Sequence, residues 1–156
     1  MLLEGLQLPL TTPFYPDGRL NLLKLEYNVA RYSKTPVAGL VALGELGEPT
    51  MLSEDETRLV LRGVAGAAGM EKVLVAGVSR DSVTQTLDLA ESAAKFGYDA
   101  VLVKQPSLFE PGAPGQFTKE LLTAQTFGTG NACAGWQRTR IEARCCATRG
   151  FWKRDC

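Results

Sequence analysis

Four apolar runs, spaced by about 30 residues, constrain the fold of this chain more than any other feature of its sequence. Each run is a continuous stretch rich in Val, Leu and Ala rather than an alternation of apolar and polar residues. Continuous runs of this length are typical of strands that are buried on both faces of a parallel sheet. The sequence therefore predicts four parallel strands, within residues 6–14, 37–44, 72–78 and 99–106.

The segments between the runs have the periodicity of amphipathic helices. Apolar residues recur every three or four positions after Asn21, after Ser53 and after Ser82. The predicted apolar faces are Leu22, Leu25, Val29 and Tyr32; Leu59, Val60, Val64 and Ala67; and Val83, Leu87, Ala90 and Ala94. A further helix is predicted to begin near residues 116–122, so strands and helices alternate along the chain.

The ends of these helices carry recognisable signals. Ser53 with Glu56, and Ser82 with Gln85, match the capping-box pattern, in which the two side chains satisfy each other's unpaired amides. Gly97 is placed to end the third helix, because glycine tolerates the left-handed conformation of a C-terminal stop. These signals support the predicted boundaries.

Repeated right-handed strand–helix units leave two architectures for an α/β chain, an open doubly wound sheet or a (β/α) barrel. In both, ligands meet the carboxyl ends of the strands, and the loop GELGEPTML at 44–52 leaves the second strand at that end. Its glycines allow close backbone approach and unusual dihedral angles, so its amides could hold a carboxylate or phosphate. Alternatively, Gly44 and Gly47 only shape a turn, and the neighbouring carboxylates are solvated or favour the helix N-terminus.

Composition excludes several classes of function. With 156 residues, 45% of them hydrophobic, the chain is long enough for a globular domain of ordinary size. No apolar run reaches the roughly 18 residues of a membrane span, and the N-terminus has no basic leader region, so we expect a cytoplasmic protein without a membrane partner. The 17 basic residues balance 17 acidic ones, which argues against nucleic acid. Without histidine the chain lacks the usual zinc ligand, and we expect no metal and no cofactor.

Three ordered segments resemble one known family over residues 6 to about 122. They are PLTTPFYPDGRLN, GLVALGELGEPTMLSEDE and VLVAGVSRDSVTQTLDLAESAAKFGYDAVLVKQP. Together they are similar to the N-terminal half of the dihydrodipicolinate synthase and N-acetylneuraminate lyase family of pyruvate-dependent class I aldolases. The resemblance implies a (β/α)₈ barrel, here its first four βα units, and a homo-oligomer. It also implies a Schiff base between a strand-six lysine and a small 2-oxo acid such as pyruvate.

The resemblance also implies a substrate site. In that family a G-x-x-G-E loop holds the carboxylate of the keto acid, which assigns substrate binding to Gly44, Glu45, Leu46 and Gly47. The two middle residues depart from the family pattern. Glu45 stands where a Ser or Thr usually relays a proton, and an ionised Glu45 would repel a bound carboxylate. Leu46 offers no side-chain hydrogen bond. These two differences indicate a divergent member of the family that has an altered substrate, or one that binds the substrate carboxylate through backbone amides.

Two further elements of the family pattern are missing from the matching region. The tyrosine pair that commonly follows strand four aligns with Ser107 and Leu108. The Schiff-base lysine has no counterpart, since a family barrel needs about 250 residues. Lys104, near the end of the fourth predicted strand, is a weak substitute because strand lysines more often pair or snorkel. The catalytic residues therefore stay unassigned, and we expect a truncated chain that is inactive alone. The alternative is a non-catalytic half-barrel that acts in assembly or binding by covering its open sheet edges.

Residues 127–156 differ from residues 1–126 and are treated as a separate irregular region. They contain all four cysteines, six basic residues against two acidic ones, and neither Val nor Leu. The cysteines, Cys133, Cys145, Cys146 and Cys156, are poorly spaced for a metal site. A basic arm that binds nucleic acid or an acidic partner is a second interpretation. We favour a third, a segment never selected to pack, such as the product of a wrong reading frame, a splice variant or readthrough.

Overall fold

The computed structural model describes residues 3–104 and 151–152. Four strands form its parallel sheet: β1 (Gln7–Pro9), β2 (Gly39–Ala42), β3 (Val73–Gly77) and β4 (Ala100–Leu102). Helices α1 (Leu22–Ser33), α2 (Glu54–Ala67) and α3 (Val83–Lys95) connect them, and two short 3₁₀ helices, η1 (Glu45–Gly47) and η2 (Pro49–Met51), follow β2. The four predicted strands and three of the predicted helices are therefore confirmed, and the expected helix near 116–122 lies outside the described residues.

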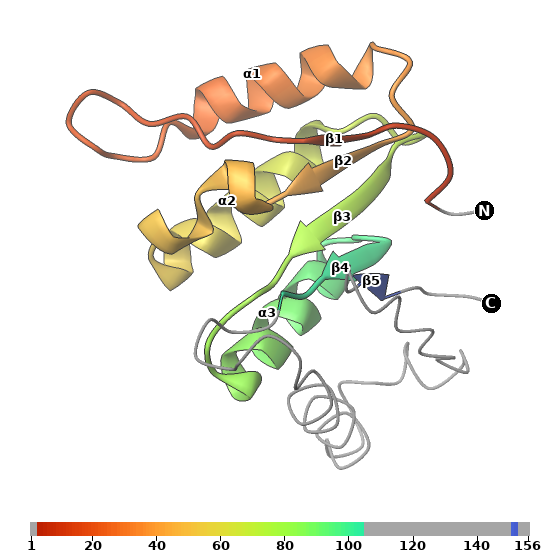
Figure 1. Ribbon diagram of the computed structural model, residues 1–156. Helices are drawn as coiled ribbons and strands as arrows, with labels where there is room; N and C mark the ends of the chain where they lie inside the picture. Colours follow the sequence, from red (N-terminus) through yellow and green to blue (C-terminus); the bar gives the residue numbers. More distant parts are fainter. Residues whose placement is uncertain (1–2, 105–150, 153–156) are drawn as a thin grey trace.

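The strand order distinguishes the two predicted architectures. The strands are hydrogen-bonded in chain order, so each parallel strand lies beside the next, and Figure 1 shows them fanning out from β1 to β4. A doubly wound sheet reverses its order at a switch point, whereas a (β/α) barrel does not. The described residues therefore form the first part of a barrel.

The last strand was not expected from the sequence. β5 (Phe151–Trp152) pairs antiparallel with β4, with Val101 opposite Trp152 and Leu102 opposite Phe151. It lies within the region for which the sequence predicted no regular structure. The boundary predicted at residue 126 is outside the described residues.

The core lies between the sheet and its helices. Alternate strand residues, Leu40 and Ala42 in β2 and Leu74 and Ala76 in β3, pack against the buried faces of the helices. The helices contribute Leu25, Val29, Val60, Leu61, Val64, Leu89 and Ala93. The prediction of strands buried on both faces fails for β1, where Pro9 is exposed and the preceding Leu6 is 68% exposed. β1 pairs with only one strand, β2, within the described part of the chain.

The predicted helix faces are mostly correct, with two differences. Leu59 was assigned to the apolar face of its helix, but it is 45% exposed beside the buried Val60. On α3 the buried residues are Thr86, Leu89 and Ala93, one position away from the predicted face. Thr86 can be buried because its hydroxyl donates to the Ser82 carbonyl. The buried face of α3 therefore includes a polar residue, which a prediction from hydropathy alone does not select.

The helix ends follow their sequence signals. Asn21 accepts from the Lys24 amide at the start of α1, and the Ser53–Glu56 capping box is complete. At α3, Ser82 accepts from the Gln85 amide, which is half of the predicted box. Gly97 has a φ of 90°, and its amide donates to Ala94 while that of Tyr98 donates to Ala93. This pair of bonds is a Schellman motif, so Gly97 ends α3 as predicted.

Candidate functional site

The carboxyl ends of β1 to β4 bring four loops to one edge of the sheet. The loop after β2 contains the predicted substrate-binding residues Gly44, Glu45, Leu46 and Gly47, most of which lie in η1. Thr12, in the segment after β1, is buried and donates its hydroxyl hydrogen to the Gly47 carbonyl at 2.7 Å. This bond joins the first and second loops, and it fixes the end of η1 where the sequence predicted a ligand loop.

The unusual dihedral angles of this loop fall on residues other than those predicted. Leu43 has a φ of 55° and Glu48 a φ of 48°, whereas Gly44 has an ordinary φ of −68°. The prediction that Gly44 and Gly47 supply unusual dihedrals is therefore wrong. A left-handed non-glycine residue costs free energy, and such residues cluster at ligand sites. Gly47 serves close approach instead, since a Cβ there would lie 3.3 Å from the Leu10 carbonyl oxygen.

Gly77, the last residue of β3, makes room for the same loop. A Cβ on Gly77 would overlap the Leu43 carbonyl oxygen and lie 2.6 Å from the carbonyl carbon. The Leu43–Gly44 peptide therefore rests directly on the backbone of β3. The loop backbone is held from both sides, by Thr12 in the segment after β1 and by Gly77 at the end of β3.

Two amides open the 3₁₀ turn of this loop. In η1 the Gly47 amide donates to the Gly44 carbonyl, and the Glu48 amide donates to the Glu45 carbonyl. The amides of Glu45 and Leu46 open the 3₁₀ turn, where no intrahelical acceptor exists, and they have no backbone acceptor elsewhere in residues 3–104. Adjacent amides in this setting can donate to one carboxylate. The side chain of Leu46 is 59% exposed and adds no polar group.

Glu45 and Lys104 meet across the carboxyl edge. Lys104 Nζ donates to Glu45 Oε1 at 2.6 Å, and the two side chains are 69% and 79% exposed. The hydrogen bond from Lys104, together with its charge, lowers the pKa of the Glu45 carboxyl. Lys104 is held at its backbone by Ser79, whose Oγ accepts from the Lys104 amide at 2.7 Å. The loops after β2, β3 and β4 are thus joined through polar contacts.

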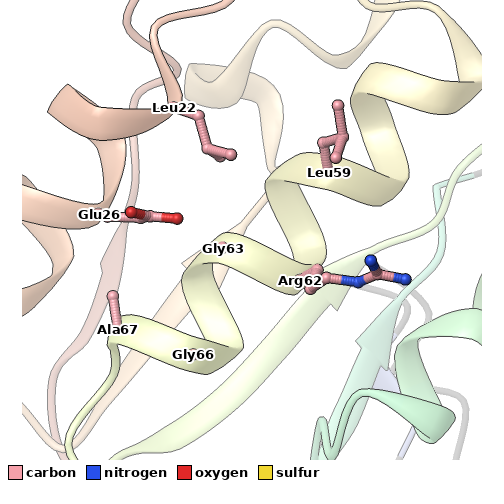
Figure 2. A pocket seen from close by; sticks show the side chains of 7 residues that line it. All are labelled: Leu22, Glu26, Leu59, Arg62, Gly63, Gly66 and Ala67. Carbon is pink, nitrogen blue, oxygen red and sulfur yellow. The ribbon is translucent and has the colours of Figure 1, made fainter.

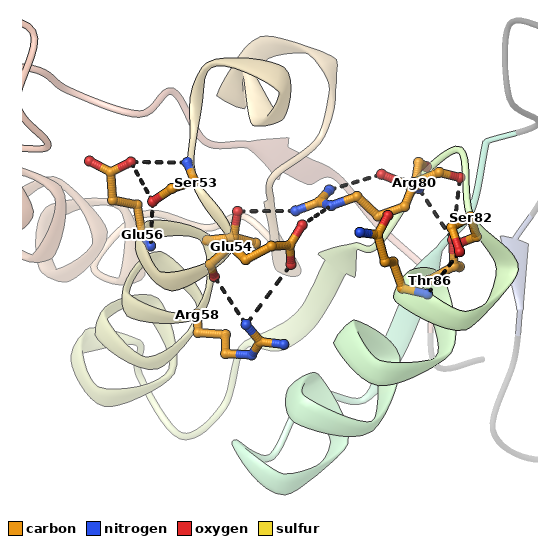
Figure 3. A network of polar contacts seen from close by, with 10 residues as sticks. Ser53, Glu54, Glu56, Arg58, Arg80, Ser82 and Thr86 are labelled. Carbon is orange, nitrogen blue, oxygen red and sulfur yellow. Dashed lines mark hydrogen bonds and ion pairs between the residues drawn. The ribbon is translucent and has the colours of Figure 1, made fainter.

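A second polar network connects the loop after β3 with the start of α2. Arg80 donates through Nε to Glu54 Oε1 at 2.9 Å, through one terminal nitrogen to Thr57 Oγ1 and through the other to the Ser79 carbonyl. Figure 3 shows its guanidinium extending from this loop to the first turn of α2. The sequence analysis missed Arg80. The available signal was an arginine three residues after the end of a buried strand, on the loop that leaves the carboxyl edge.

The described surface also has a groove of about 370 Å³ on the helix layer. It lies between Leu22 and Glu26 of α1 and the α2 residues Leu59, Arg62, Gly63, Gly66 and Ala67, as Figure 2 shows. The exposed Leu59 is one of its lining residues. None of the loop residues at the carboxyl edge lines it, so it is separate from the candidate site.

Residues 3–104 and 151–152 contain no group of three or more His, Cys, Asp or Glu side chains arranged to hold a metal ion. Cys133, Cys145, Cys146 and Cys156 lie outside the described residues, as do Ser107 and Leu108. Within the described ranges no helix is both long enough and apolar enough to cross a bilayer.

Comparison with known proteins gives consistent matches. Residues 2–123 match the model of the dihydrodipicolinate synthetase family. The chain is 30% identical over 124 residues to a 4-hydroxy-tetrahydrodipicolinate synthase of Methylococcus capsulatus, covering 80% of this chain and 43% of the relative. It is 34% identical over 106 residues to the enzyme of the same name from Methanothrix thermoacetophila, covering 68% and 35%.

Solved structures extend the likeness to the fold. An N-acetylneuraminate lyase from Mycoplasma synoviae aligns with a TM-score of 0.71 at 25% identity, covering 79% of this chain and 43% of that one. A dihydrodipicolinate synthase family protein from Coccidioides immitis aligns with a TM-score of 0.68 at 27% identity, covering 75% and 39%. The chain spans less than half the length of each of these relatives.

Proposed function

This chain belongs to the dihydrodipicolinate synthetase family, and we propose that it forms the 2-oxo-acid-binding half of a pyruvate-dependent class I aldolase. The observation that supports the proposal most is the pair of adjacent amides at Glu45 and Leu46, which lack backbone acceptors in residues 3–104 and lie on a loop held by Thr12 and Gly77. These amides receive the substrate carboxylate, so the departure of the Leu46 side chain from the family pattern does not remove the donors.

The chemistry of a class I aldolase requires an amine in addition to this loop. The amine adds to the C2 carbonyl and water leaves, so that a protonated imine accepts the electron pair of the carbon–carbon bond. The lysines of residues 3–104 are Lys24, Lys34, Lys72, Lys95 and Lys104. Lys72, which is largely buried, precedes β3 and donates to the carbonyls of Thr35 and Val37, at the end of the sheet opposite the candidate site.

Lys104 is the lysine of this group at the carboxyl edge, and its contact with Glu45 argues against an imine role. An ammonium ion in a 2.6 Å ion pair has no lone pair with which to attack a carbonyl. In our proposal the imine-forming lysine comes from the part of the family barrel beyond the matched residues, and this chain alone binds the 2-oxo acid without catalysing its reaction. We propose further that its ligands are small 2-oxo acids such as pyruvate, that it forms a homo-oligomer and that it is located in the cytoplasm.

The test combines binding with chemical trapping. Isothermal titration calorimetry with pyruvate should give saturable binding to the purified chain. Borohydride treatment of the same mixture, followed by intact-mass spectrometry, should give no pyruvate adduct. An adduct on any lysine of the chain would overturn the assignment of the amine to another segment. Absence of pyruvate binding would overturn the proposal as a whole.

A second candidate, a half-barrel that assembles with another half, is favoured by one observation. Gln7 of β1 has both side-chain polar atoms buried with no hydrogen-bond partner within the described residues, and its oxygen occupies the space where a Cβ on Gly39 would lie. Buried polar atoms are nearly always paired, which is consistent with a partner contributed by another segment. Native mass spectrometry should give a defined dimer if this assembly forms, and a monomer would contradict it.

A further inference from the structure

The groove between α1 and α2 has no part in the binding of a 2-oxo acid proposed above. It lies on the helix layer, and no loop residue of the carboxyl edge lines it. On the α2 side its lining includes the small residues Gly63, Gly66 and Ala67. A Cβ added to Gly66 would meet no atom within 4 Å. These short residues therefore leave room over α2 for side chains of another polypeptide segment.

Exposed apolar side chains border this groove. Leu59, which lines it, is 45% exposed. On α1, Leu23 and Tyr27 are 75% and 56% exposed, and both lie within one helical turn of the lining residue Glu26. Single exposed apolar residues are common, whereas a group of them beside a groove is typical of a surface that binds another protein.

Glu26 is a half-buried carboxylate in this mostly apolar groove. Figure 2 shows its side chain pointing from α1 toward α2, and a Cβ on Gly63 would lie 3.3 Å from Glu26 Oε1. The carboxylate accepts no hydrogen bond and forms no ion pair within residues 3–104 and 151–152. Because a carboxylate that is partly withdrawn from water is normally paired, this position favours a partner that supplies a cation.

Arg62 carries a positive charge on the other side of the groove. It belongs to α2, and Figure 2 shows its side chain extending away from α1. Its guanidinium lies over the Phe96 ring, 5.3 Å from the ring centroid, and it has no acidic partner among the described residues. The two sides of the groove thus carry opposite charges, which makes the surface complementary to a second copy of itself.

We propose that this groove is the interface of a twofold-symmetric homodimer, in which Glu26 of each copy pairs with Arg62 of the other. In such a contact, residue i of one copy meets residue j of its partner, and j meets i. A twofold axis along the groove places α1 of one copy over α2 of the other, so the pair forms twice. Leu23 and Tyr27 then cover the open space beside the partner's Gly66.

The inference rests on the homo-oligomer of the proposed function and adds the surface that forms it. It does not depend on the binding of a 2-oxo acid, because the groove and the loop after β2 share no residue. Failure of the one is therefore distinguishable from failure of the other.

The experiment measures the dissociation constant of the dimer by sedimentation equilibrium. Wild type should dimerise. Glu26→Arg and Arg62→Glu should each weaken the dimer by about tenfold or more, because each reversal brings like charges together at two symmetric contacts. The double variant Glu26→Arg with Arg62→Glu should restore the dimer. An equimolar mixture of the two single variants should form a heterodimer, because both of its contacts again join opposite charges.

A matched control is available on α3. Lys95 is exposed and lies outside the groove, so the charge reversal Lys95→Glu should leave the dissociation constant unchanged. If wild type dimerises and neither single variant weakens the dimer, the interface lies elsewhere and the homo-oligomer stands.

Two further outcomes would overturn the inference. One is the absence of a heterodimer in the mixture of the single variants. The other is a wild type that stays monomeric at every concentration, which would also remove the homo-oligomer from the proposed function. Calorimetric titration of the same samples with pyruvate tests the binding of the 2-oxo acid separately.

Discussion

Arg80 and Glu54 form a 2.9 Å ion pair that joins the loop after β3 to the first turn of α2. Arg80 comes from the third strand–helix unit and Glu54 from the second, so the contact connects neighbouring units at the carboxyl edge of the sheet. Glu54 opens the helix that follows the candidate carboxylate loop. The pair therefore links the position of that loop to the packing of the next unit.

Replacing Arg80 tests this link. Arg80→Met should lower the free energy of unfolding by about 2 kcal/mol, because it removes hydrogen bonds from a charged, mostly buried group to Glu54 and Thr57. The matched control is Arg58→Met. Arg58 contacts the same carboxylate at 3.9 Å from an exposed position, and its loss should cost less than about 1 kcal/mol. Chemical denaturation measures both, and equal losses for the two variants would contradict the role given to Arg80.

Adding a methyl group at Gly77 should destabilise the protein, whereas adding one at Gly66 should not. Gly77→Ala places a Cβ against the Leu43 carbonyl, so the loop must shift and we expect destabilisation of roughly 1–3 kcal/mol. Gly66→Ala, on an exposed face of α2 with no atom within 4 Å, should stabilise the protein by up to about 1 kcal/mol. Denaturant unfolding of the two variants is the measurement. If the two substitutions change the free energy of unfolding by similar amounts, the loop does not rest on β3.

Thr12 should matter for ligand binding as well as for stability. Thr12→Val removes the hydroxyl that donates to the Gly47 carbonyl and leaves that carbonyl without this partner, at a cost of about 1 kcal/mol. Because the bond fixes the end of η1, pyruvate affinity should also fall. Thr12→Ser keeps the hydroxyl and is the matched control. Pyruvate affinity unchanged in Thr12→Val, measured by calorimetry, would contradict this positioning role.

The α2 capping box predicts a pH dependence of stability. The Ser53 amide, and then its hydroxyl, lower the pKa of the Glu56 carboxyl below its usual value. A carboxyl whose pKa is lower in the folded state stabilises the fold at pH values above the ordinary glutamate range, and this contribution is lost as the pH falls through the lowered pKa. Glu56→Gln keeps a capping acceptor without this titration.

The measurement is the difference in unfolding free energy between wild type and Glu56→Gln at several pH values. The difference should favour wild type at neutral pH and shrink as the solution becomes acidic. A difference that is constant with pH would show that Glu56 titrates alike in the folded and unfolded states.

The elements that could be predicted from the sequence are those whose signals lie within a short segment of the chain. Continuous apolar runs predicted the four parallel strands, and Ser53 and Gly97 act at their helix ends as expected. The strand order also followed once the chain was seen to resemble a barrel family. The strands and helix ends depend on residues within one turn or one strand of each other, which a single sequence displays directly, whereas the strand order does not.

The contacts that define the site are not local. Lys104 and Glu45 are 59 residues apart, Thr12 and Gly47 are 35 apart, and Arg80 and Glu54 are 26 apart. No periodicity in the sequence pairs such residues. The dihedral angles of the loop were not predicted either, since the positive φ values fall on Leu43 and Glu48, whereas composition pointed to the glycines.

The central claim, that the loop after β2 binds the carboxylate of a 2-oxo acid, is tested most directly by amide chemical shifts. We would titrate the ¹⁵N-labelled chain with pyruvate and, in parallel, with its uncharged methyl ester. The account predicts saturable shifts of the Glu45 and Leu46 amides with pyruvate and much smaller ones with the ester. Equal shifts with both compounds, or pyruvate shifts confined to residues elsewhere in the chain, would contradict it.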